Sequence, residues 1–169
     1  MSRRVAILGL GQRGARWAEA FHRSGWHVRG FDPEPGAGRV LDTLLDGRRE
    51  QTISATVQDA DIVLCCLPER IELMQMVLQR AQAEAPAGSV VAVASRVQDI
   101  EAVQGCALRP GNVVRVVEAD DGAFSLDVSE RNAPGVQRHA RDVLAELAGI
   151  LSLQDDVWSE TYQRGAESA

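Results

Sequence analysis

Residues 4–14, RVAILGLGQRG, decide the fold of this chain. The first five residues form an apolar run that ends at Gly9, as in a strand buried on both faces of a parallel sheet. The glycines that follow, Gly9, Gly11 and Gly14, have the spacing G-x-G-x-x-G, and a helical pattern begins directly behind them. A strand, a glycine turn and a helix in this order predict the opening of a Rossmann dinucleotide-binding unit.

Each position of the turn has a physical role in that interpretation. Gly9 allows a tight turn, Gly11 lets the backbone approach a pyrophosphate at the positive end of the helix, and Gly14 permits close packing of helix on strand. The residues between them, Leu10, Gln12 and Arg13, complete the predicted cofactor-binding turn. Arg13 is a long side chain for this place, and it either covers the phosphates or crowds them.

Asp32 follows Gly14 by eighteen residues, at the end of the next predicted strand. An acid at this place accepts hydrogen bonds from the adenosine ribose hydroxyls, whereas the 2′-phosphate of NADP would meet a like charge. The sequence therefore predicts NAD as the cofactor. The alternative is a Rossmann-like domain that has lost its ligand.

The rest of the chain alternates strands and helices. Helices are expected at 12–24, 37–47, 71–85, 99–104 and from Val136 to Gly149, and strands at 26–31, 61–67, 89–94 and 112–117. Weaker patterns predict strands at 51–55, 123–128 and 151–157. This order predicts one α/β domain with a doubly wound, mostly parallel sheet over residues 1–158, followed by a disordered tail at 159–169.

The composition of the chain argues against several classes of partner and of functional site. The net charge of −6 argues against nucleic acid or an anionic membrane as partner, and no run of 18 apolar residues exists to span a bilayer. The N-terminus lacks the pattern of a signal peptide, so a cytoplasmic location is expected. All 18 basic residues are Arg, which excludes a Schiff-base Lys and a Walker-type phosphate site. The spacing of Cys65, Cys66 and Cys106 fits neither a disulfide framework nor a zinc site, and small buried hydrophobes are expected instead.

Several motifs together resemble the NAD-binding domain of the 3-hydroxyacyl-CoA dehydrogenases, in the branch that includes the L-carnitine dehydrogenases and lambda-crystallin. They are GLGQRG at 9–14, FDPEPGA at 31–37, ADIVLCCLPERIEL at 60–73, APAGS at 85–89 and LRPGNVV at 108–114. The resemblance implies that Leu67, Pro68 and Glu69 lie near the nicotinamide-side ribose and that Ser95 lies near the cofactor. A carboxylate at the N-terminal end of a helix is the other interpretation of Glu69.

The chain departs from this family at positions that carry its chemistry. Met74 stands where the family has a Lys, Arg96 where it has a Ser, and Val117 where it has the catalytic His. The family also continues into a helical domain beyond the point where this chain ends. Glu118, Asp120 and Asp127 lie near Val117 in sequence, either as substitute bases or, more commonly, as solvated acids.

Two functions fit these observations. The first is an NAD-dependent dehydrogenase, or part of one, that acts on a hydroxyacyl or hydroxy-acid substrate. The second is a catalytically inactive NAD(H)-binding protein that senses the cofactor or regulates a partner. A homodimer, or a partner protein in place of the helical domain, is also expected. Phe124, Leu126 and Val128 alternate along 123–128 and would either bury against a second copy or pack on the final helix, and Trp158 is a second candidate for the contact.

Overall fold

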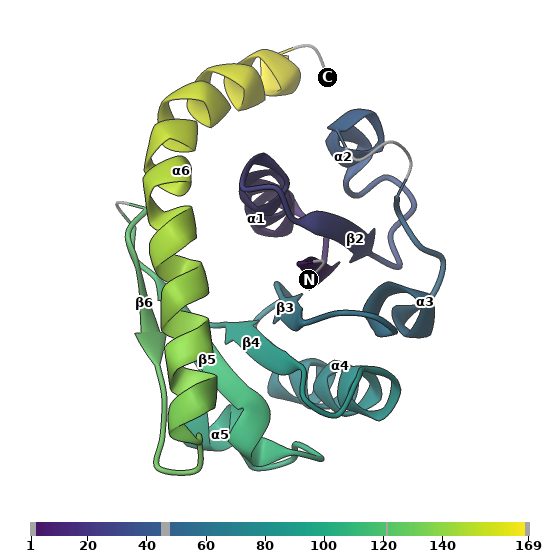
Figure 1. Cartoon of the computed structure of the whole chain (residues 1–169). Helices are drawn as coiled ribbons and strands as arrows, with labels where there is room; N and C mark the ends of the chain where they lie inside the picture. The colour runs from purple at the N-terminus through teal and green to yellow at the C-terminus, as the bar shows by residue number, and fades with distance from the viewer. Residues whose placement is uncertain (1–2, 45–47, 121, 168–169) are drawn as a thin grey trace.

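The computed structural model describes residues 3–44, 48–120 and 122–167, and for residues 40, 41, 44 and 152–167 it describes the backbone alone. One sheet of six strands runs through the molecule in the order β2-β1-β3-β4-β5-β6 (Figure 1). The first five strands are parallel, and β6 joins β5 antiparallel at the edge. The strands are β1 (Arg4–Leu8), β2 (His27–Phe31), β3 (Ile62–Cys65), β4 (Val90–Ala94), β5 (Val113–Glu118) and β6 (Phe124–Asp127).

The strand order confirms the predicted doubly wound, mostly parallel sheet. The chain passes from β1 to β2 on one side and then returns to place β3 on the other side. The order therefore reverses between β1 and β3, and in open α/β sheets a crevice for a ligand opens at the carboxyl ends of the strands at such a point.

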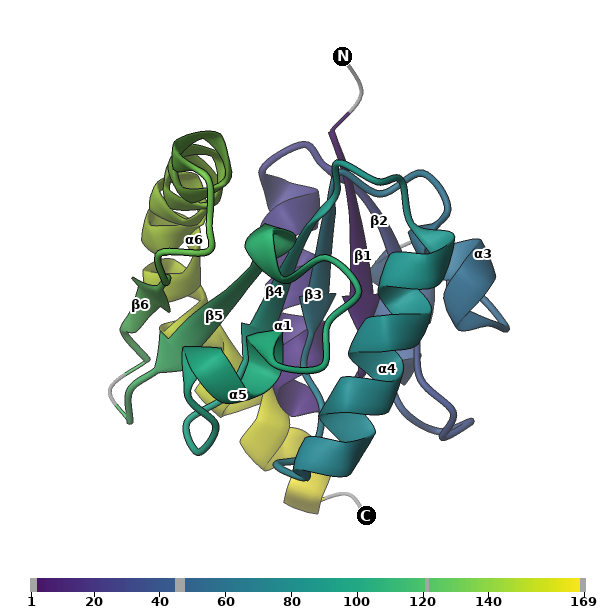
Figure 2. The same ribbon diagram turned by 90° about the horizontal axis from the view of Figure 1, so that it is seen from below.

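Helices cover both faces of the sheet (Figures 1 and 2). The helices α1 and α6 pack on one face, and α3, α4 and α5 on the other. Their bounds are α1 (Gln12–Arg23), α2 (Arg39–Leu44), α3 (Ile53–Val57), α4 (Ile71–Glu84), α5 (Ile100–Gln104) and α6 (Pro134–Glu167), and a 3-10 turn covers Pro110–Asn112.

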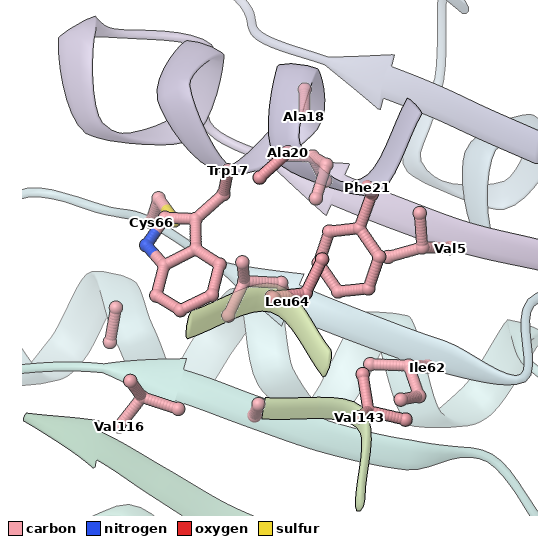
Figure 3. Packing of buried hydrophobic residues seen from close by; sticks show 14 of the residues in the cluster. Val5, Trp17, Ala18, Ala20, Phe21, Ile62, Leu64, Cys66, Val116 and Val143 are labelled. Atoms are coloured by element: carbon pink, nitrogen blue, oxygen red, sulfur yellow. The ribbon is translucent and has the colours of Figure 1, made fainter. Parts of the chain in front are cut away.

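The core lies in two layers because the strands are buried on both faces. Along β1, Val5 and Ile7 belong to the cluster under α1 and α6, while Ala6 and Leu8 belong to the cluster under α4. Figure 3 shows the first cluster, where Trp17 of α1 lies over the strands beside Phe21. The continuous apolar runs of the sequence therefore correspond to central parallel strands.

The strand expected at 51–55 is wrong. The structure has helix α3 (Ile53–Val57) there, because the Thr52 side chain accepts a hydrogen bond from the Ala55 N–H at 3.0 Å and caps the helix. Near this segment, a single parallel bridge joins Arg49 to Gly30 of β2. A local side-chain cap thus outweighs a weak strand pattern.

The strand expected at 151–157 is also wrong, and the last helix does not end at Gly149. Helix α6 continues to Glu167 and so runs over most of the segment expected to be a disordered tail. Ala140, Val143, Leu147 and Leu151 are all buried, which shows that the helical period continues past Gly149. One glycine inside a helix costs only about 1 kcal/mol relative to alanine.

The apolar face of β6 is not a free surface. Phe124, Leu126 and Val128 pack against the cluster that contains Ala140 and Val143 of α6, so the packing alternative holds for this face. The side chain of Trp158 lies outside the described residues. No helix within the described ranges is both long enough and apolar enough to cross a membrane.

Candidate functional site

A cleft of about 730 Å³ opens at the carboxyl ends of β1, β2 and β3, where the strand order reverses. The glycine turn after β1 forms its floor, the start of the loop after β3 forms one wall, and apolar side chains of α3 and α4 close one end. The lining residues are Leu8, Gly9, Gly11, Gln12, Arg13, Gly14, Phe31, Asp32, Pro33, Ile53, Cys66, Leu67, Pro68, Arg70, Leu73, Met76 and Val77.

The three glycines of the turn differ in what surrounds them. Gly9 has φ +98°, and a Cβ there would lie 2.2 Å from the carbonyl oxygen of Cys66. A Cβ at Gly14 would lie 1.8 Å from the carbonyl oxygen of Gly9. A Cβ at Gly11 would meet no protein atom within 4 Å. Gly9 and Gly14 are therefore required by the fold itself, whereas Gly11 faces open space in the cleft.

Helix α1 presents an uncompensated positive end to this space. Gly11 is its N-cap residue and makes no side-chain cap, and no acidic residue occupies the first turn. The N–H groups at the start of a helix and its dipole together attract anions. The geometry suits a diphosphate above Gly11.

Asp32 is held in place by two backbone N–H groups. Its Oδ2 accepts a hydrogen bond from Leu10 N and its Oδ1 from Glu34 N, both at 2.8 Å. Each carboxylate oxygen has a further lone pair, so both remain able to accept from ribose hydroxyls. Leu10 takes part only through its backbone, because its side chain is buried against Gly30.

The residues after β3 divide between the cleft and a neighbouring loop. Leu67 and Pro68 line the cleft, but Glu69 does not. The Glu69 carboxylate accepts from Ser95 Oγ at 2.7 Å and from the Arg96 N–H at 2.9 Å, and Ser95 Oγ in turn accepts from the Gln98 N–H at 2.9 Å. Glu69 therefore joins the loop after β3 to the loop after β4. The sequence carried no signal for this bridge.

The three acids near Val117 each have a partner. Asp120 pairs with Arg96 at 2.6 Å, Asp127 pairs with Arg115 at 2.9 Å, and Glu118 accepts from the Trp17 indole N–H. Val117 itself lies opposite Ser125 at the end of the β5–β6 pair.

One departure from the dehydrogenase pattern, Met74, and two of the three cysteines lie in the core. Met74, at the position of the family's Lys, is 2% exposed and packs under the sheet on α4. Cys65 and Cys66 are buried as expected, and burial raises the pKa of the Cys65 thiol to about 12. Burial, followed by the charge of Glu118, raises the pKa of the Cys66 thiol still further. Neither thiol is a nucleophile near neutral pH. Cys106 is exposed.

Other features of the molecule do not compete with the cleft. Two further hollows, of about 340 and 830 Å³, include residues at the starts of β1 and β2, such as Arg4 and His27, or beside β3 and β4, such as Asp61 and Ser89. Neither contains any part of the glycine turn. Among the described residues, no group of His, Cys, Asp and Glu side chains could hold a metal ion.

Comparisons with known proteins agree with this geometry. The family model described as the NAD binding domain of 6-phosphogluconate dehydrogenase matches residues 4–108. The chain is also 30% identical over 131 residues to L-carnitine dehydrogenase of Streptomyces griseus, an alignment that covers 66% of this chain and 39% of that protein. The chain thus spans about two fifths of this relative's length.

Solved dehydrogenases share the fold. The 5-formyl-3-hydroxy-2-methylpyridine 4-carboxylic acid 5-dehydrogenase, an NAD⁺-dependent dismutase, superposes with a TM-score of 0.77 at 22% identity, over 87% of this chain and 55% of that one. The (S)-3-hydroxybutyryl-CoA dehydrogenase of Ralstonia eutropha gives a TM-score of 0.76 at 15% identity, over 88% and 62%.

The residues that match the family model include the glycine turn, Asp32 and the start of the loop after β3. The predicted likeness to the L-carnitine dehydrogenases of the 3-hydroxyacyl-CoA dehydrogenase family is confirmed. This chain belongs to the family of NAD-binding domains represented by that of 6-phosphogluconate dehydrogenase.

Proposed function

We propose that this domain binds NAD(H) across the cleft, with the adenosine ribose on Asp32 and the diphosphate on the glycine turn. The nicotinamide half then passes Leu67 and Pro68 toward the loop that Glu69 and Ser95 hold together. The observation that carries this proposal is the pairing of an open Gly11 with a pre-oriented Asp32 in one cleft. Asp32 is the one carboxylate among the described residues that line the cleft, so NAD is preferred to NADP.

We further propose that the bound cofactor serves a dehydrogenase reaction on a hydroxyacyl or hydroxy-acid substrate. NAD supplies the hydride acceptor for such a reaction, and a general base must take the proton of the hydroxyl group. Val117 has no group that can do so, and its acidic neighbours are engaged by Trp17 and by two arginines. We propose that the base comes from another copy of the chain or from a partner protein, and that the domain works in the cytoplasm.

A second candidate is a catalytically inactive NAD(H)-binding protein that reports cofactor level to a partner. Val117 favours it, because its side chain has no group that can accept a proton at the position where the resembled family has its catalytic His. Both candidates share the same binding site. They differ only in whether the bound cofactor takes part in a hydride transfer.

Calorimetric titration with NAD, NADH and NADP tests the shared part. We expect NAD and NADH to bind more tightly than NADP, and no binding at millimolar ligand would remove both candidates. Acetoacetyl-CoA with NADH then tests the missing base: the domain alone should turn over far below the usual range of about 1–1000 per second, and turnover within that range would contradict the assignment of the base to a second chain. Light scattering against the 18.3 kDa monomer mass tests self-association.

A further inference from the structure

Arg13 connects the glycine turn, on the floor of the cleft, to the wall formed by the start of the loop after β3. It lies in the first turn of α1, and its guanidinium Nη2 donates a hydrogen bond to the carbonyl oxygen of Leu67 at 3.2 Å. Leu67 stands at the beginning of the loop after β3, on the side of the cleft where the nicotinamide half is proposed to pass. The side chain therefore crosses the space between the glycine turn and the β3 loop.

This placement is unfavourable for a cation unless an anion joins it. The start of α1 is the positive end of the helix dipole, and its first turn carries no acidic residue to balance Arg13. A carbonyl oxygen is the acceptor of the one side-chain hydrogen bond found for Arg13 in the described structure, and it bears no net charge. The charge of Arg13 also lowers the pKa of the Cys66 thiol, which lines the cleft, although burial has a larger and opposite effect.

We propose that Arg13 is a clamp for the cofactor diphosphate. Without ligand the guanidinium rests on Leu67, and with ligand it exchanges this neutral carbonyl oxygen for the charged diphosphate oxygens. Hydrogen bonds between guanidinium and phosphate are charge-assisted and often bidentate, so the exchange is favourable. The inference rests on the proposed binding of NAD(H), and it decides that Arg13 covers the phosphates rather than crowding them.

The same exchange frees the Leu67 carbonyl where the nicotinamide half passes. Binding of the diphosphate thus clears the path of the nicotinamide half of the same NAD molecule. Ligands that lack a diphosphate leave the clamp on Leu67, and the chain has no lysine that could replace it.

The experiment compares ADP, NAD and adenosine in calorimetric titrations of the full chain. The variants are Arg13→Met, which removes the guanidinium, and Arg13→Lys, which keeps the charge but loses the planar fork. Arg23→Met is the matched control, because it removes the same charge from the exposed end of the same helix, where Arg23 pairs with Glu19 at 2.9 Å. Thermal unfolding of each variant checks that it is folded.

We expect Arg13→Met to weaken ADP and NAD by about tenfold to a hundredfold, with Arg13→Lys between it and the parent chain. Adenosine affinity should stay unchanged in every variant, and Arg23→Met should match the parent chain for all three ligands. Equal or tighter ADP binding by folded Arg13→Met would overturn the clamp while leaving NAD binding intact. If the parent chain binds neither ADP nor NAD, the proposed function fails as well.

Discussion

Gly11 and Gly14 stand three residues apart in one turn, yet the structure assigns them opposite roles. A Cβ at Gly14 would lie 1.8 Å from the Gly9 carbonyl oxygen and 2.8 Å from its carbon, so α1 must move off the end of β1. A Cβ at Gly11 would meet nothing within 4 Å, and its backbone conformation, φ −67° and ψ −169°, is open to any residue. Alanine substitution therefore separates folding from binding.

We expect Gly14→Ala to cost about 3 kcal/mol of unfolding free energy, the upper end of ordinary overpacking, because both clashing atoms belong to the backbone. For a chain of this length that is about 6–12 °C in Tm. Gly11→Ala should leave Tm within about 2 °C of the parent chain, since nothing in the protein is displaced. It should weaken NAD by at least about tenfold, or about 1.4 kcal/mol, since its methyl group occupies the approach of the pyrophosphate.

Differential scanning calorimetry measures the first effect and isothermal titration the second. Gly25→Ala is the control: its Cβ also meets nothing within 4 Å, but φ is +84°, so it reports the cost of backbone strain away from the cleft. A Tm for Gly14→Ala equal to that of the parent chain would refute the packing argument. Unchanged NAD affinity in Gly11→Ala would refute the placement of the diphosphate.

Four further perturbations test the cofactor site and other parts of the fold. Asp32→Ala should weaken NAD by about 1.5–3 kcal/mol in calorimetry and abolish the preference over NADP, since a charged hydrogen-bond acceptor is lost. A thiol reagent at pH 8 should modify Cys106 alone in the native chain and all three cysteines in denaturant. Because the pKa of Cys65 rises from 9.0 to about 12 on folding, the unfolded thiol loses its proton first, so stability measured by urea unfolding should fall as pH rises above about 9. Glu69→Ala should lower Tm by about 2–4 °C, because the exposed carboxylate that joins two loops contributes about 1 kcal/mol; an unchanged Tm would show that the bridge is not formed in solution.

The sequence predicted the elements that carry strong periodic or apolar patterns. The apolar runs at 4–8, 61–67 and 89–94 contain the central strands β1, β3 and β4, because a strand buried on both faces admits few polar residues. The glycine turn and Asp32 were predicted to meet, and the structure brings them together through the bond from Leu10 N to Asp32. At these positions the residue types themselves indicate the backbone conformation and the burial.

Other features depended on which of two opposing local effects was the stronger, and the sequence pattern alone does not indicate this. At Thr52 a cap outweighed a weak strand pattern, and at Gly149 burial of Leu147 and Leu151 on both sides kept the helix intact. The partners of Glu69 and Arg13 lie at least 26 residues away along the chain, so no local pattern indicates them. Side chains that bridge two loops are visible only after the loops have been placed.

Trp17 is a buried residue of α1 that contacts β5 and β6. Its indole N–H donates to Glu118 of β5, and its ring meets Phe124 of β6 edge-on, with centroids 5.0 Å apart. The helix that follows the glycine turn is thereby tied to β5 and β6. A shift of α1 at the glycine turn would change the surroundings of this indole, so the fluorescence of Trp17 would report the event at the opposite edge of the sheet.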